Sequence, residues 1–169
     1  MLMVLIPANI CHAQYPNPGD NILNPNLDKF EGTWKFTSGS EEIIVQLKKV
    51  NYLSPNNYHY DILMGVHSYK LNGVTIEDYL SNFNAIGQNQ DGTIFIGNHP
   101  EDGANKIVGT MNDPLKHKQN YISITFIDAV TPQIQWTLHN LSGVHIQKNG
   151  EPPFDNSFTL PQTLTLLKQ

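Results

Sequence analysis

Seven histidines in a chain without arginine are the first residues to consider for chemistry, because imidazole binds metals and transfers protons near neutral pH. His59 and His67 share one side of an expected strand, but eight residues at about 3.3 Å each place them roughly 26 Å apart. His139 and His145 are better placed, since a hairpin centred on Ser142 would set their side chains about 5 Å apart. Both alternate with apolar residues that must face inward, so we expect an exposed cross-strand pair rather than a metal site.

Nucleophilic and paired-carboxylate catalysis find little support in the sequence. The single cysteine, Cys11, lies in the N-terminal apolar run, and no serine has the Gly-x-Ser-x-Gly context of a strained nucleophile turn. The acidic pairs Glu41-Glu42 and Glu77-Asp78 are sequence neighbours, which point to opposite faces within a strand. We therefore expect no catalytic residue, no cofactor and no enzymatic activity. A hydrolase that uses outward-facing histidines and acids remains the alternative.

Composition limits the class of protein. The 169 residues, 39% of them hydrophobic, suit one domain with a packed core. All ten basic residues are lysines, and the net charge is -5. A nucleic-acid binder needs a basic stripe, so this partner is excluded. No segment reaches the roughly 18–20 apolar residues that a membrane-spanning helix needs.

The N-terminus predicts export. Residues 1–13 look like the tail of a secretory signal peptide cleaved between Ala13 and Gln14, although a basic n-region is missing, as in a truncated start or an unusual leader. A buried first strand is one alternative. A lipoprotein with Cys11 at the mature start is another, and the branched Ile10 disfavours it. We expect a mature chain without thiols in the periplasm or outside the cell.

The rest of the chain divides into a lead-in and one all-β domain. Residues 14–30 form a Pro- and Asn-rich lead-in that ends in a short helical turn, capped by Asn24 and followed by Pro25. From residue 31 to residue 169, apolar residues recur at every second position between turn signals. The strands expected are 33–37, 42–50, 58–70, 93–98, 106–111, 121–128, 133–140, 144–147 and 164–168.

These strands are joined by short links, which favours a single antiparallel up-and-down β-barrel of about eight to ten strands over a sandwich. Asn72-Gly73 is a strong hairpin signal. Residues 74–80 are compatible with a strand or a short helix. The segment 82–92 is long for a hairpin link and suggests a rim or lid.

A first resemblance rests on the helical turn that leads into Gly32-Thr33-Trp34. It resembles the entry of calycins, the superfamily of lipocalins and fatty-acid-binding proteins, in which the Trp of Gly-x-Trp plugs the closed end of the barrel. The resemblance assigns Gly32 and Trp34 to the barrel floor. Lipocalins pack an Arg across this Trp, and here Lys168 is the residue that could cover it.

A second resemblance covers nearly the whole mature chain. The residues that carry it are Gly32-Thr33-Trp34, Gly65, His67, Tyr69-Lys70, Asn72-Gly73-Val74, Glu77-Asp78-Tyr79-Leu80, Ser157-Phe158-Thr159-Leu160-Pro161 and the terminal Leu-Lys-Gln. With these residues the chain resembles an uncharacterised family of exported Bacteroidetes proteins, a domain of unknown function, and the resemblance implies no activity.

Aromatic residues from several strands share the parity expected of an interior. They fill a core, or they surround a cavity for a small hydrophobic or amphipathic ligand, as the calycin resemblance implies. The residues predicted to line such a cavity are Tyr58, Tyr60, Met64 and Phe126. The leading hypothesis is thus an exported, non-enzymatic binder of a small ligand. The alternative is an envelope-associated interaction module with a filled core that binds a protein or glycan through its Asn-rich loops.

Overall fold

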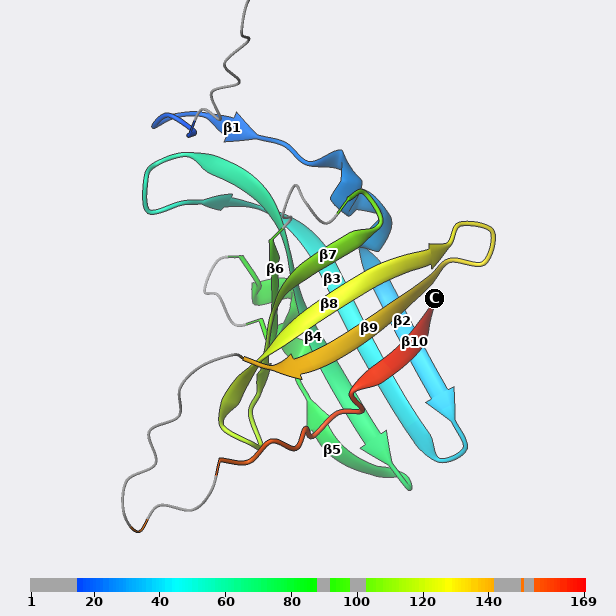
Figure 1. The fold of residues 1–169 in the computed structure, drawn as a ribbon. Coiled ribbons are helices and arrows are strands. Elements are labelled where there is room, and N and C mark those ends of the chain that lie inside the picture. Colours follow the sequence, from blue (N-terminus) through cyan, green and yellow to red (C-terminus); the bar gives the residue numbers. More distant parts are fainter. Residues whose placement is uncertain (1–14, 88–91, 98–102, 142–149, 151–153) are drawn as a thin grey trace, which may run out of the picture.

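Antiparallel strands make up most of the structure, a computed structural model that describes residues 15–87, 92–97, 103–141, 150 and 154–169 (Figure 1). The elements in chain order, with 3-10 helices written η, are β1 (Asn21–Ile22), η1 (Pro25–Phe30), β2 (Gly32–Ser38), β3 (Glu41–Leu53), β4 (His59–Leu71), β5 (Val74–Asp78), η2 (Leu80–Ala85), β6 (Ile94–Gly97), β7 (Lys106–Asp113), β8 (Lys118–Asp128), β9 (Gln133–Asn140) and β10 (Thr163–Lys168).

Eight of these strands close into a barrel. β2 pairs with β3, β3 with β4, and β4 with β6. The meander then continues through β7, β8, β9 and β10. β10 returns to pair antiparallel with β2, where Lys168 lies opposite Trp34. The predicted all-β up-and-down barrel is confirmed, and the sandwich alternative is not.

β4 has three successive partners on one side, the first of which is β1, paired in parallel at His59 and Tyr60. Its end, Ser68–Leu71, pairs with β5, and its middle, Leu63–Gly65, pairs with β6. Asn72 and Gly73 both have positive φ and form the tight turn that the Asn-Gly dipeptide predicts. Residues 74–78 are therefore a strand. Between β5 and β6 the chain leaves the sheet and forms η2, so the first part of the predicted rim segment is a 3-10 turn.

The interior of the barrel is packed with apolar side chains. On β9, Ile134, Trp136 and Leu138 are at most 1% exposed, whereas the intervening Gln135 and His139 are exposed. Such alternation leaves one face of each strand to the core. Each of the eight barrel strands contributes buried residues to one hydrophobic cluster, with Trp34 and Trp136 its largest members. Burial of this surface is the main source of stability.

One end of the barrel is closed by η1 and Trp34. Asn24 caps η1 by accepting a hydrogen bond from the Asn26 amide, which confirms the predicted helical turn. Phe30 on η1 is fully buried, and its carbonyl accepts a hydrogen bond of 2.8 Å from Trp34 Nε1. The Lys168 ammonium lies 5.2 Å from the centre of the Trp34 ring. The prediction that Lys168 covers this Trp is confirmed.

A second, smaller cluster lies on the outer face of β4. Ile62, Met64 and Val66 pack there against Ile86, and Phe83 of η2 contacts the cluster. This outer cluster explains why β4 is buried on both faces between Asp61 and Tyr69. In the described part of the chain, no helix is long and apolar enough to cross a membrane.

Gly65 on β4 offers a test of the barrel's packing. A Cβ added there would lie 2.5 Å from the carbonyl oxygen of Gln46, which is backbone and cannot rotate away. We expect Gly65→Ala to lower the free energy of unfolding by about 1–3 kcal/mol, as overpacking does. Gly97→Ala on β6 is the matched control, because its Cβ would meet nothing within 4 Å. Urea unfolding measures both, and equal stabilities would contradict the packing described.

Candidate functional site

A polar network is buried in the barrel wall where β4, β5 and β6 meet. His67 is fully buried, and its Nε2 lies 2.9 Å from a carboxylate oxygen of Glu77. Its Nδ1 lies 2.8 Å from the hydroxyl of Thr93, just before β6. Glu77 is 4% and Thr93 7% exposed. Burial of such groups is costly unless each has a partner, and each has one here.

The order Thr93, His67, Glu77 is that of a nucleophile, a base and an orienting acid. With Glu77 ionised, Nε2–H donates to Glu77 and Nδ1 accepts the Thr93 hydroxyl proton. Access is poor, however, because Thr93 is nearly buried and its backbone N–H already donates to the Gly65 carbonyl. That N–H is therefore not free to stabilise an oxyanion. The geometry fits a network that fixes three strands together better than it fits a hydrolase.

A β-bulge places Glu77 in this network. The register between β4 and β5 shifts between Tyr69 and Lys70, so that Glu77 comes opposite Tyr69 and Asp78 opposite Ser68. Without the shift, the two-residue turn would set Glu77 opposite Ser68, whose side chain points to the other face. Bulges re-aim side chains in this way. The sequence reasoning missed this network, although the Asn72-Gly73 turn could have brought Glu77 close to His67.

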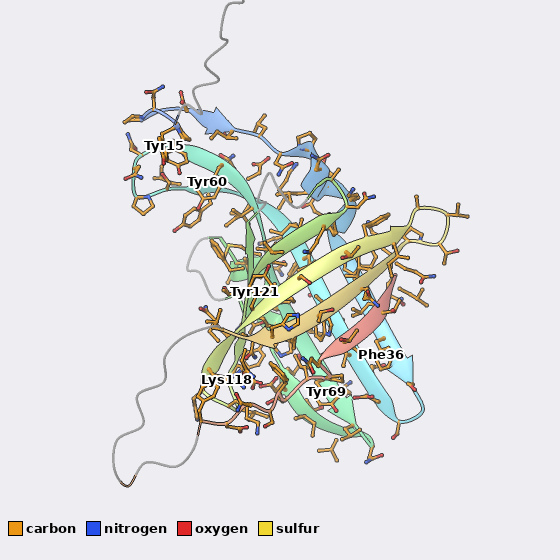
Figure 2. The ribbon with its side chains drawn as sticks, in the orientation of Figure 1. Tyr15, Phe36, Tyr60, Tyr69, Lys118 and Tyr121 are labelled. Atoms are coloured by element: carbon orange, nitrogen blue, oxygen red, sulfur yellow. The ribbon has the colours of Figure 1, made fainter. Side chains whose placement is uncertain are left out.

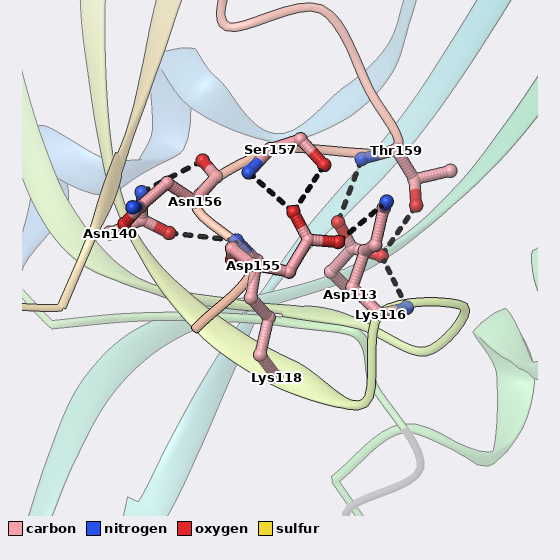
Figure 3. Close-up of polar contacts among 8 residues, drawn as sticks. All are labelled: Asp113, Lys116, Lys118, Asn140, Asp155, Asn156, Ser157 and Thr159. Atoms are coloured by element: carbon pink, nitrogen blue, oxygen red, sulfur yellow. Dashed lines mark hydrogen bonds and ion pairs between the residues drawn. The ribbon is translucent and has the colours of Figure 1, made fainter. Parts of the chain in front are cut away.

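Residues 154–162, here called the C-terminal segment, run along the end of the barrel away from η1 (Figure 1). Leu160 belongs to the main hydrophobic cluster, and Phe158 packs against it. The buried Asp113 at the end of β7 holds this segment. Its two carboxylate oxygens accept hydrogen bonds of 2.9 and 2.6 Å from the Thr159 amide and hydroxyl (Figure 3).

A second anchor is exposed and charged. Asp155 accepts a hydrogen bond of 2.8 Å from the Lys116 ammonium and two from the amide and hydroxyl of Ser157 (Figure 3). The Lys118 ammonium donates to the Asp155 carbonyl and to the Asn140 side chain. The hydrogen bond from Lys116, followed by the two from Ser157, holds the pKa of Asp155 well below its ordinary value.

The C-terminal segment and the barrel wall together form a cleft of about 930 Å³, here called the outer cleft. Its lining residues are Tyr121 of β8, His139 and Asn140 of β9, Leu141, and Asn156, Phe158 and Gln162 of the C-terminal segment. Tyr121 and His139 face each other across the two strands, with ring centroids 6.3 Å apart. Among the described residues that line it, none is Lys, Asp or Glu, although the Lys118 ammonium contacts Asn140 and lies 4.8 Å from the centre of the Phe158 ring. The described lining thus offers mainly ring faces and amide groups.

Comparison with known families shows to which family the chain belongs and assigns it no activity. The model described as a family of unknown function (DUF6705) matches residues 1–169. The chain belongs to this family. No curated protein and no solved structure matches the chain. The predicted resemblance to a domain of unknown function is confirmed, and the DUF6705 barrel has to be interpreted from its own residues.

The predicted lining residues of this DUF6705 chain do not come together around one cavity. Tyr58 and Tyr60 are neighbours, with ring centroids 5.7 Å apart, and Tyr60 and Met64 belong to the outer cluster. Phe126 instead packs against the main cluster, with its ring 6.3 Å from Trp34. The predicted floor residues Gly32 and Trp34 lie in the closing seam of the barrel.

The predicted histidine pair is only partly described. His139 is exposed and lines the outer cleft, whereas His145 and the expected strand 144–147 lie outside the described residues. Residues 1–14, with Cys11, also lie outside them. Among the described residues, no group of three or more His, Cys, Asp or Glu side chains could hold a metal ion.

Glu77→Ala tests the buried network. Removal of one partner leaves the His67 imidazole buried without its acceptor, and we expect the free energy of unfolding to fall by about 3 kcal/mol. Asp78→Ala is the control, because this exposed neighbour only accepts from the Leu80 amide; we expect a loss below about 1 kcal/mol. Chemical unfolding of both variants measures the difference. A similar loss in both would argue against the network.

Asp155 predicts a pH dependence of the C-terminal segment. Because its folded pKa is lowered, its contribution is complete above the ordinary value of about 3.9 and is lost only as pH falls through the lower folded value. The Ser157 amide, which donates to Asp155, reports this titration by NMR. We expect a midpoint below about 3.9 that disappears in Asp155→Asn. A midpoint at the ordinary value would contradict the anchor.

Proposed function

We propose that this protein is an exported, non-enzymatic barrel that binds a small amphipathic molecule in the outer cleft. The observation that carries the proposal is the cleft itself. Its volume of about 930 Å³ lies within the roughly 300–1,000 Å³ typical of small-molecule sites. Its lining combines aromatic rings with amides, which suits a ligand with an apolar face and polar edges.

The packing of the interior favours a site on the outside of the barrel. Trp34 and Trp136 are fully buried inside it, and Phe30 is fully buried at the closed end. Trp34 on β2 contacts Phe126 on β8, although β10 and β9 separate these strands in the sheet. This contact therefore crosses the interior that an enclosed ligand would otherwise occupy.

The residues that line the cleft have different roles in the proposed binding. Tyr121 and Phe158 offer ring surface, and both are half-buried, so they are held in place before a ligand arrives. Asn140 is engaged by Lys118 and by the Asn156 carbonyl, which fixes the junction of the two walls. Gln162 and His139 are exposed and available to select the polar edge of a ligand.

The absence of enzymatic activity is part of the proposal. His67, which has the acid–base partners of a catalytic histidine, is fully buried and engaged on both ring nitrogens. The exposed His139 has Tyr121 as its ring neighbour. Export is supported by the apolar residues 1–13 alone.

Ligand-observed NMR tests the cleft. A mixture of neutral monosaccharides, nucleosides and aromatic carboxylic acids is added to the full chain, and saturation transfer identifies the compounds that bind. We expect Tyr121→Ala to weaken the binding of such a compound about tenfold, equivalent to about 1.4 kcal/mol. Tyr15→Ala is the control, because Tyr15 is 92% exposed and does not line the cleft.

Native mass spectrometry of protein purified from its own host provides the complementary readout. A consistent bound mass that disappears in Tyr121→Ala supports the cleft. A bound mass that survives both Tyr121→Ala and Phe158→Ala would place the ligand elsewhere, and the absence of binding in both experiments would overturn the proposal.

A further inference from the structure

A row of aromatic rings lies on the outer surface of the β3–β4 hairpin. Tyr58, Tyr60, Tyr52 and Phe95 follow one another with ring centroids 5.7, 5.6 and 5.9 Å apart. These four side chains are here called the aromatic row. They come from two strands of the hairpin, from the residue before β4 and from β6, so the barrel fixes their order.

The hairpin that carries the row extends past β2 and β6, and the two-residue strand β1 pairs with it there, at His59 and Tyr60. β2 pairs with β3 only as far as Leu47, and β6 pairs with β4 only from Leu63 onward. The pairs from Asn51 with Asp61 to Leu53 with His59 therefore stand beyond the barrel wall, as the extended cyan-green hairpin of Figure 1 shows. Figure 2 shows Tyr60 on this hairpin, away from Tyr121, which lines the outer cleft.

The rings are held in place and remain accessible. Phe95 is 37% exposed, and Tyr52, Tyr58 and Tyr60 are half-buried. Tyr52 meets Tyr60 at 77° and Phe95 at 87°, the edge-to-face arrangement that aromatic pairs prefer. Burial, and then the neighbouring Tyr52 and Tyr58, raise the pKa of Tyr60. Its hydroxyl therefore stays protonated near neutral pH as a hydrogen-bond donor and acceptor.

The strand segments that carry the row contain no charged side chain, and Asp20 lies beside the hairpin, where its carbonyl accepts a hydrogen bond from the His59 amide. Residues 51–60 contain no Lys, Arg, Asp or Glu, and residues 94–97 of β6 contain none either. Asn51, Asn56 and Asn57 add exposed amides in the same hairpin. Lys48, further along β3, points its ammonium at Phe83 of η2, 5.3 Å from the ring centre. A polyanion would need lysines or arginines here, so neither nucleic acid nor an anionic membrane fits.

We propose that the aromatic row binds a neutral polysaccharide chain. A sugar ring has an apolar C–H face that stacks on an aromatic ring and hydroxyls that pair with phenols and amides, and the row supplies both. A line of rings on a protruding hairpin also suits a chain better than a compact ligand. A stable protein partner would need about 800 Å² on this side with an apolar centre, and four half-exposed rings and amides make a poorer match to that requirement.

Affinity electrophoresis tests this proposal with the full chain. Native gels contain one neutral polysaccharide each, namely hydroxyethylcellulose, mixed-linkage β-glucan, xylan or galactomannan, and parallel gels contain the acidic polymers alginate or pectin. We expect retardation by at least one neutral polymer and by neither acidic one. Tyr60→Ala and Phe95→Ala should each raise the apparent Kd at least about tenfold.

The variants are chosen to separate binding from folding. Leu115→Ala is the control, because Leu115 is 55% exposed, apolar and outside the row. Phe95 lies on a different strand from Tyr60, so one variant remains informative if the other fails to fold in circular dichroism. Tyr60→Phe separates the ring from its hydroxyl, and an intermediate affinity is expected.

Several outcomes would overturn the proposal. These are no retardation by any neutral polymer, retardation by the acidic polymers alone, retardation that survives both ring variants, or capture of a protein by the row without polysaccharide binding. The proposal does not rest on the outer cleft. Polysaccharide binding without a cleft ligand would overturn only the proposed function, and the reverse result would overturn only this inference.

Discussion

The pairing of β10 with β2 is the constraint on which the whole barrel depends. Without it, β2 and β10 would each present an open edge, and the sheet would not close. The seam is built around one side-chain contact, the Lys168 ammonium over the Trp34 ring. Gly32 has a φ of +115°, and a Cβ there would lie 3.1 Å from the Lys168 side chain. The residues of the Gly-x-Trp motif and the lysine are thus a single structural unit.

The contact between Lys168 and Trp34 in this seam gives the calycin resemblance a physical basis. A planar guanidinium would stack on the Trp face, whereas an ammonium acts as a compact point charge. Gly32 leaves room for the lysine stem to pass, and the ammonium reaches the ring from β10. At this position a cation and an aromatic ring join the first and last strands of the barrel, and lysine meets that requirement where lipocalins use arginine.

Much of this fold follows from the sequence, because alternation and turn chemistry are local. The eight barrel strands, the capped turn at Asn24, the Asn72-Gly73 hairpin and the Lys168 contact could be predicted, whereas β1 was not expected and residues 74–80 are compatible with a strand or a short helix. The orientation of β4 could not, since η2 covers its outer face and both sides of the strand are apolar. The apolar pattern therefore predicts Tyr60 and Met64 inside the barrel, whereas both belong to the outer cluster. Glu77 was missed because one bulge reverses its direction, and the outer cleft because its walls lie far apart in the chain.

The position of the closing strand in the chain bears on how the protein is made. β2 and β10 contact each other across more than a hundred residues, so their pairing is among the most non-local contacts in the fold. Until residues 163–168 leave the ribosome, β2 has no partner on one side and Trp34 lacks its cation. Before β10 is made, the sheet is therefore open and has two edge strands with unpaired backbone N–H and C=O groups. Delayed closure therefore creates a period during synthesis in which the incomplete sheet needs protection from aggregation.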